Sequence, residues 1–427
     1  MSTKQRRIAE AARKYRGESL KSVAHHIDVE WMYCAYELVR RDGAKGIDGV
    51  GAEEYERNLR ENLANLVDKL KSGTYRAPAV RRVYIPKAGS TEKRPLGIPT
   101  YEDKILQRAV QLVLEPIYEE EFYDFSYGFR PGKSAHQALD RLRNESMNIG
   151  GGYIIDMDIS KYFDSIPHDK LWEILGQRVS DGVIHRIIGK WLNAGVMEDE
   201  TIRRSEKGSP QGGVISPLLS NVYLHEVLDE WFDQTVQPRL EGKSFMVRYA
   251  DDAVIGCEKK EDADRIMKVL ALRFEKYGLT IHPEKTRLID FTKPVGESRK
   301  GKGSFTFLGF CHYWTKSRKG RWMVGRKTDS KRLSRALKII TRWCRENRHR
   351  AKREQHKELA AKLRGHYAYY GVSLNYAGIG LFYEQVKRVW SKWLNRRSRK
   401  TSQDWQQFGE YLRNFPLPRP KIVHLFS

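Results

Sequence analysis

Apolar segments that carry aspartates constrain this chain more than any other feature. Residues 153–159 (YIIDMDI) alternate, so Asp156 and Asp158 share one face of an expected strand. Residues 245–257 (FMVRYADDAVIGC) predict two apolar strands with the pair Asp251-Asp252 at the turn between them. A charge among apolar side chains is costly unless something neutralises it. The pattern therefore predicts a sheet whose carboxylates meet a cation, and divalent cations such as Mg²⁺ prefer carboxylate oxygens.

The rest of the chain alternates helix-like and strand-like segments, which predicts a mixed α/β (α+β) body. Thr100–Asp103 resembles a capping box and opens a segment with one apolar helix face. Further along, the pattern predicts a strand at 304–314, a loop or hairpin tip at 296–304, and a break near 315–330. Helices are expected after that break, at about 328–347, 355–370 and 379–397.

Charge is distributed unevenly along the chain. The net charge is +24, and residues 316–427 hold 29 Lys and Arg against 7 Asp and Glu. The remaining residues carry 49 basic and 47 acidic side chains. Such asymmetry predicts that the last quarter binds a polyanion, since Lys and Arg that neutralise phosphates release counterions and supply salt-sensitive affinity.

The expected helix at 379–397 combines an apolar stripe with a basic face. The tryptophans of the stripe, Trp390 and Trp393, are interpreted as core in preference to a base-stacking platform. The basic side chains are the candidate RNA contacts; they are Lys387, Arg388, Lys392, Arg396 and Arg397.

Several classes of protein fit poorly. No apolar run reaches the length of a membrane span, and the N-terminus lacks the apolar core of a secretory signal. The four cysteines show no metal-ligand spacing such as C-x-x-C, which argues against zinc and for free thiols in a reducing compartment. A cytoplasmic, bacterial location is expected.

Three motifs give the chain a family resemblance. Tyr249-Ala-Asp-Asp252 resembles the YxDD box of reverse transcriptases, and Asp158-Ile-Ser-Lys-Tyr-Phe163-Asp164 resembles the preceding palm motif. Residues 209–221 (SPQGGVISPLLSN) lie between them, in the family's order. The chain thus resembles the group II intron-encoded reverse transcriptase/maturase family. Further matching blocks extend the resemblance over most of the chain, at 43–49, 81–87, 93–100, 126–132, 279–286, 307–310 and 417–422.

The resemblance implies an RNA-directed DNA polymerase that uses two divalent metals, Mg²⁺ or alternatively Mn²⁺, and dNTP substrates. Asp158 and Asp251 would bridge both metals, with Asp252 close by and the Ile159 carbonyl on the triphosphate-side metal. Asp156 is the rival of Asp158 on the same strand face. Asp158 is preferred because Phe163 follows it at the family's spacing.

The same resemblance implies the nucleotide site. Lys87 and Arg94 would bind the triphosphate, and Phe163 would exclude a ribose 2′-hydroxyl. Gln211 would touch the nucleotide or template, while Gly212 and its neighbour allow close backbone approach. Two roles are open: Arg130 braces this region, and Lys285 is either a general acid for the leaving pyrophosphate or a surface lysine.

A right-hand polymerase fold is implied. It would comprise an N-terminal extension and fingers (1–150), a palm (151–315, with a helical insertion at about 168–235) and a basic helical thumb or maturase domain (316–427). The chain ends about where that thumb ends in the family, and no cysteine cluster follows Cys344. Cutting of the second target strand is therefore not expected.

Three functions remain open from sequence. The first is an intron-encoded enzyme of a mobile element that copies intron RNA, binds it to assist splicing and inserts it into target DNA. The second is a stand-alone relative in phage defence or DNA repair. The third, a non-catalytic RNA-binding splicing factor, is disfavoured because such a protein has no need of the costly acids Asp158, Asp251 and Asp252.

Overall fold

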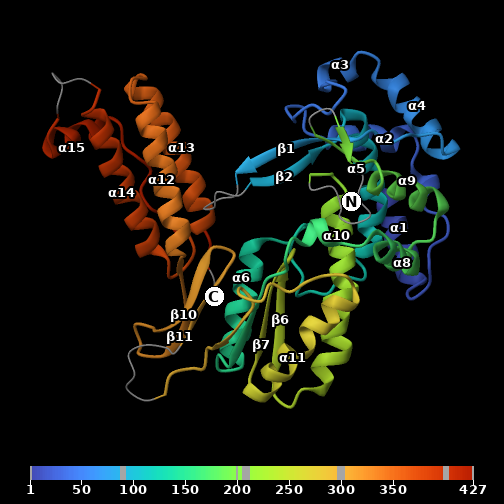
Figure 1. The fold of residues 1–427 in the computed structure, drawn as a ribbon. Coiled ribbons are helices and arrows are strands. Elements are labelled where there is room, and N and C mark those ends of the chain that lie inside the picture. Colours follow the sequence, from blue (N-terminus) through green and yellow to red (C-terminus); the bar gives the residue numbers. More distant parts are fainter. Residues whose placement is uncertain are drawn as a thin grey trace. The chain divides into compact units, whose positions relative to one another are not determined.

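The computed structural model describes residues 2–86, 93–198, 201–203 (backbone only), 212–295, 303–397 and 403–425. The chain divides into two compact units (Figure 1). The first unit comprises Met1–Ala138 and Ile154–Leu288, and the second comprises Leu139–Tyr153 and Ile289–Ser427. The three domains expected from the sequence, with their boundaries, stay a prediction. None of the described helices is long and apolar enough to cross a membrane.

Helices make up most of the first unit. Those before the first strand are α1 (Thr3–Lys14), η1 (Ala24–His26), α2 (Val29–Glu37), α3 (Ala52–Glu56) and α4 (Leu59–Ser72). Those that follow are α5 (Tyr101–Tyr118), α7 (Tyr162–Ser165), α8 (His168–Arg178), α9 (Gly182–Leu192), α10 (Ser216–Leu224), η2 (His225–Val236), η3 (Gln237–Arg239) and α11 (Lys260–Lys276). Segment η2 is π-helical and continues directly from α10.

Two four-stranded sheets accompany these helices. One has the order β2-β1-β4-β5, from strands β1 (Val80–Pro86), β2 (Lys93–Ile98), β4 (Val196–Glu198) and β5 (Thr201–Arg203). The other has the order β6-β7-β3-β8, from strands β3 (Tyr153–Met157), β6 (Ser244–Tyr249), β7 (Asp252–Cys257) and β8 (Arg287–Asp290). The strands predicted at 153–159 and 245–257 are thus confirmed, and they lie in one sheet because β7 pairs with both β6 and β3.

Helix α5 is the central helix of the first unit. Thr100 caps its N-terminus by accepting from the Asp103 backbone N–H at 3.2 Å, as the sequence predicts. Burial raises the pKa of the Asp103 carboxyl to about 6, although donors from Tyr75, Trp191 and Gln107 act in the opposite direction. The amide oxygen of Gln107 accepts from the Val214 N–H at 2.7 Å. Helix α5 thereby fixes the segment that leads into α10.

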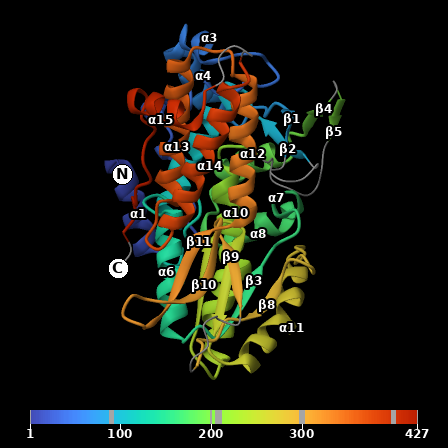
Figure 2. The same ribbon diagram turned by 90° about the vertical axis from the view of Figure 1, so that its left-hand side faces the viewer.

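The second unit combines a helical bundle with a three-stranded sheet of order β11-β10-β9 (Figure 2). Its elements are most of α6 (Ala135–Asn148), β9 (Ser304–Phe307), β10 (Phe310–Lys316), β11 (Trp322–Thr328), α12 (Ser330–Glu346), α13 (Lys352–Tyr370), α14 (Tyr376–Leu394) and α15 (Trp405–Asn414). The three predicted C-terminal helices are confirmed as α12, α13 and α14. Trp390 is fully buried among Leu359, Phe382 and Phe408, which confirms its interpretation as core.

Two local predictions were wrong. The strand expected at 304–314 is a hairpin, since Leu308 and Gly309 adopt left-handed backbone (φ +49° and +80°) and turn the chain. The break expected near 315–330 contains β11, which pairs with β10 over seven residues. The loop predicted at 296–304 lies largely outside the described residues.

Replacing Gln107 with leucine should destabilise the first unit. The change leaves the partly buried Val214 N–H without its acceptor, which costs about 2 kcal/mol of unfolding free energy. Urea denaturation of Gln107→Leu measures the loss. The matched control is Gln111→Leu, one turn later on α5, where only half-buried side chains are contacted. Equal stability of the two variants would contradict this role of Gln107.

Candidate active site

The Asp251-Asp252 pair sits at a two-residue turn. Tyr249 pairs with Asp252 across the β6–β7 hairpin, so Ala250 and Asp251 form the turn itself. Tight hairpin turns of this length favour positive φ, and Ala250 has φ +56°. The apolar strands are buried, whereas Asp252 is exposed at the start of β7. The fold thus presents carboxylates at the end of a rigid hairpin.

Asp158 directly follows β3, and β3 is the neighbour of β7 in the sheet. Its backbone is fixed by the segment that precedes β8: its N–H donates to the Thr286 hydroxyl at 3.2 Å, and its carbonyl accepts from the His282 N–H at 2.8 Å. Ile159 forms an antiparallel bridge with Ile281. The Asp158 carboxylate accepts from the Lys285 ammonium at 2.9 Å. Lys285 therefore lies at the site, as the sequence predicts, while its role as an acid stays a prediction.

Several neighbouring charges act on the carboxyl of Asp251. Burial raises the pKa of its carboxyl, and the charge of Asp158 raises it further, while the Arg94 and Arg248 guanidinium groups act to lower it. Asp158, Asp251 and Arg94 are thus close enough to interact electrostatically. Arg94 reaches this place from β2, where it pairs with Ile85 of β1. A divalent cation between two neighbouring carboxylates would offset the repulsion between their charges.

Asp156 occupies a different environment. Its carboxylate accepts from Arg287 of β8 at 3.1 Å. Burial raises the pKa of the Asp156 carboxyl, whereas Arg287 lowers it. The charge of Asp158 acts on both Asp156 and Asp251, but Asp156 is the one held by Arg287. This arrangement favours Asp158 over its rival as the partner of Asp251.

Phe163 and Arg130 lie in different parts of the first unit, the former on α7 and the latter in the loop after α5. Phe163 is half-buried on α7, whose first residue follows the left-handed Lys161, and its ring packs edge-on against Tyr162. The Arg130 side chain is 4% exposed and forms an ion pair with Glu119 at 2.9 Å. It also donates to the Tyr123 and Ser126 carbonyls. Arg130 thus braces its own loop.

Two predicted nucleotide ligands, Lys87 and Gln211, lie outside the described residues. The glycine after Gln211 is described, and it supports the expected close approach. Gly212 has φ +113°, and a Cβ on it would come within 2.5 Å of the Gly97 carbonyl oxygen. Backbone from the 209–221 motif thereby meets β2, the strand that carries Arg94.

The predicted RNA contacts lie on α14 and just after it. Arg388, Lys392 and Arg396 are exposed. Lys387 is bound to Glu384 at 3.1 Å, and Arg397 donates to the His349 carbonyl. Three of the five predicted residues therefore present their charge to solvent.

The described residues contain no cluster of three His, Cys, Asp or Glu side chains that could hold a metal ion by themselves. Backbone and substrate oxygens would therefore complete a metal site that is formed with Asp158 and Asp251. All four cysteines are free thiols, as expected.

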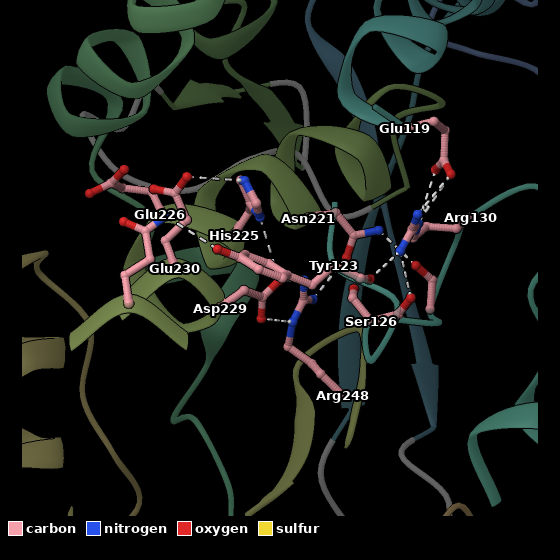
Figure 3. Close-up of polar contacts among 12 residues, drawn as sticks. Glu119, Tyr123, Ser126, Arg130, Asn221, His225, Glu226, Asp229, Glu230 and Arg248 are labelled. Carbon is pink, nitrogen blue, oxygen red and sulfur yellow. Dashed lines mark hydrogen bonds and ion pairs between the residues drawn. The ribbon is translucent and has the colours of Figure 1, made fainter. Parts of the chain in front are cut away.

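Sequence reasoning missed a buried network beneath the turn. Arg248 of β6 lies between Asp229 of η2 and Asn221 of α10 (Figure 3). Burial opposes ionisation of Asp229, but Arg248 holds the pKa of that carboxyl below its usual range. The signal was present in the sequence, since an arginine inside the apolar segment FMVRY needs a buried partner.

Comparisons with known proteins agree with this geometry. A family described as reverse transcriptase (RNA-dependent DNA polymerase) matches residues 85–312. The chain belongs to the group II intron reverse transcriptase/maturase family. It is 39% identical over 196 residues to the group II intron-encoded protein LtrA of Lactococcus lactis subsp. cremoris, a match that covers 46% of this chain but 32% of LtrA.

Two further relatives extend the comparison. Protein YkfC of Escherichia coli (strain K12) is 41% identical over 306 residues, which cover 65% of this chain and 78% of YkfC. Nuclear intron maturase 3 (mitochondrial) of Arabidopsis thaliana is 24% identical over 225 residues, which cover 46% of this chain and 31% of that protein. The family match includes β3, β6, β7 and the turn between the last two.

Asp156, which lies in β3, and Asp158, which follows it, should differ in function. Asp158→Asn should lower the rate of single-nucleotide incorporation by about a thousandfold, because it removes one of two interacting carboxylates. Asp156→Asn removes only the partner of Arg287 and should retain activity within about tenfold. Rapid-quench primer extension compares them. The reverse order of activities would show that Asp156 holds the metal.

Proposed function

We propose that the protein is an RNA-directed DNA polymerase that joins dNTPs to a primer with two Mg²⁺ ions. The observation that carries this proposal is the position of Asp251 in the β6–β7 turn, where the charges of Asp158 and Arg94 act on its carboxyl. Mutual repulsion between half-buried carboxylates favours a divalent cation, and a nearby guanidinium favours a triphosphate.

The donor set fits hard divalent cations. Asp158 and Asp251 supply carboxylate oxygens, the Ile159 carbonyl lies beside Asp158, and Asp252 stands one residue from Asp251. Bound Mg²⁺ would lower the pKa of the primer 3′-hydroxyl and stabilise charge on the triphosphate. The substrate oxygens complete the ligand sets, which accounts for the absence of a three-residue cluster among the described side chains.

The remaining residues orient the substrate. Arg94 binds the triphosphate through paired N–H donors, together with Lys87, and Gln211 contacts the nascent pair. Lys285 stands at Asp158 and donates a proton to the leaving pyrophosphate. Phe163 lies under the sugar of the incoming nucleotide, where its ring excludes a 2′-hydroxyl. Arg130 shapes the loop beside the hairpin.

Loss of Asp251 tests this proposal directly. Asp251→Ala should abolish primer extension on an RNA template with Mg²⁺, while RNA affinity changes by less than about threefold, since the carboxylate binds metal and not RNA. Extension assays and filter binding on the same preparation measure both. Full activity in the variant would refute the assignment of the site.

We also propose that the second unit binds structured RNA, including a group II intron RNA, and thereby supports splicing and insertion into target DNA. The exposed cations of α14 and the excess of basic residues in 316–427 support this role. The relatives named as intron-encoded protein and intron maturase favour it over a defence or repair function. Intron RNA sequences flanking the gene would separate these alternatives.

Removing three exposed cations should flatten the salt dependence of RNA binding. The triple variant Arg388→Gln/Lys392→Gln/Arg396→Gln should reduce the slope of log affinity against log salt by roughly two to three, because each lost phosphate contact contributes about 0.7–0.9. The control is Lys260→Gln/Lys268→Gln/Lys276→Gln, which removes equal charge from exposed positions on α11. Equal slopes for the two triples would contradict RNA binding by α14.

A further inference from the structure

A fully buried ion pair lies beneath the hairpin turn. The side chains of Arg248 and Asp229 are both 0% exposed. Burying two charges costs so much solvation that an apolar pair of similar size is often equally stable or more stable. A contribution to stability therefore does not explain why this ion pair is buried here. Its other hydrogen bonds indicate a different role.

The guanidinium of Arg248 connects three elements. Its Nε and Nη2 donate to the Asp229 carboxylate on η2. Its Nη1 donates to the Asn221 side-chain oxygen on α10 and to the Ala250 carbonyl, each at 3.0 Å. Asp229 thus fixes the orientation of the guanidinium, and the remaining nitrogen, Nη1, holds the turn through the Ala250 carbonyl. An apolar side chain could fill the same volume but could not hold the Ala250 carbonyl.

The turn needs such support. Left-handed backbone is unfavourable for a residue with a Cβ, so Ala250 keeps φ +56° only because its surroundings enforce it. On the opposite side lies Gly128, where a Cβ would come within 2.2 Å of the Ala250 nitrogen. Asn221 donates to the Gly128 carbonyl at 2.6 Å and so joins both sides. Figure 3 shows Asn221 between the two arginines, Arg248 and Arg130.

We propose that Arg248, oriented by Asp229 and Asn221, is the positioning residue of the metal site: it holds the left-handed turn that aims Asp251 at Asp158. This inference rests on the proposed function, because the distance between the two carboxylates matters only if they share a metal ion. Misplacement of a catalytic group by about 1 Å can cost roughly a hundredfold in rate. Substrate binding, which uses Arg94 on another sheet, is unaffected.

The test replaces the ion pair by an apolar pair. Arg248→Met/Asp229→Leu should fold with a melting temperature near that of the wild type, because the solvation cost disappears with the charges. Its kcat for single-nucleotide incorporation should fall about a hundredfold, while KM for dNTP stays within about threefold. Mn²⁺ affinity, measured by electron paramagnetic resonance without turnover, should fall about tenfold.

A second ion pair of the same unit is the control. Arg178 and Glu121 pair at 2.6 Å with side chains 9% and 19% exposed, and Arg178 also binds carbonyls of the N-terminal segment. Arg178→Met/Glu121→Leu should change stability without altering Mn²⁺ affinity or kcat per folded molecule. A loss of Mn²⁺ affinity in this control equal to that of the Arg248 pair would overturn the inference.

A single substitution covers the case in which the apolar pair fails to fold. Asn221→Leu keeps the volume and the Arg248–Asp229 pair but removes the link to Gly128. It should lower kcat and Mn²⁺ affinity about tenfold each. Wild-type values in this variant, or in a folded apolar pair, would overturn the inference. A wild-type protein that binds Mn²⁺ but incorporates no dNTP would instead overturn the proposed function.

Discussion

The site depends on one two-residue turn. Ala250 adopts a left-handed conformation between two buried apolar strands, and the residue that follows it is Asp251. That turn exists because β6 and β7 must pair in a register that buries Val247 and Val254 opposite each other. Two neighbours keep Ala250 in this conformation. Gly128 leaves room for it because a Cβ there would clash with Ala250, and Arg248 donates a hydrogen bond to the Ala250 carbonyl.

Electrostatics then determine what the turn can do. The pKa of the Asp251 carboxyl is raised by burial and by the charge of Asp158, while Asp156 is engaged by Arg287. Lys285 and Arg94 supply positive charge from two different elements. Carboxylates next to cationic side chains suit a site that binds divalent cations and a polyphosphate at the same time. The RNA binding proposed for the second unit would add a separate attraction for a nucleic-acid backbone.

Much of this arrangement could be predicted from the sequence, because the signals are local. Alternation in 153–159, the turn acids Asp251 and Asp252, and the apolar stripe of α14 all follow from strand and helix periodicity. The hairpin at Leu308 was missed because an apolar run hides a turn when a leucine adopts positive φ. The Arg248–Asp229–Asn221 network was missed because its members are brought together by tertiary structure, across 27 residues of sequence.

Joint binding of divalent metal by Asp158 and Asp251 is tested most directly by anomalous scattering from Mn²⁺ in crystals of the protein with primer, RNA template and a non-hydrolysable dNTP analogue. Two Mn²⁺ peaks are expected, both in contact with the carboxylates of Asp158 and Asp251. Peaks bound to Asp156, or no peak at Asp251 in a complex that contains the bound nucleotide, would contradict this joint binding.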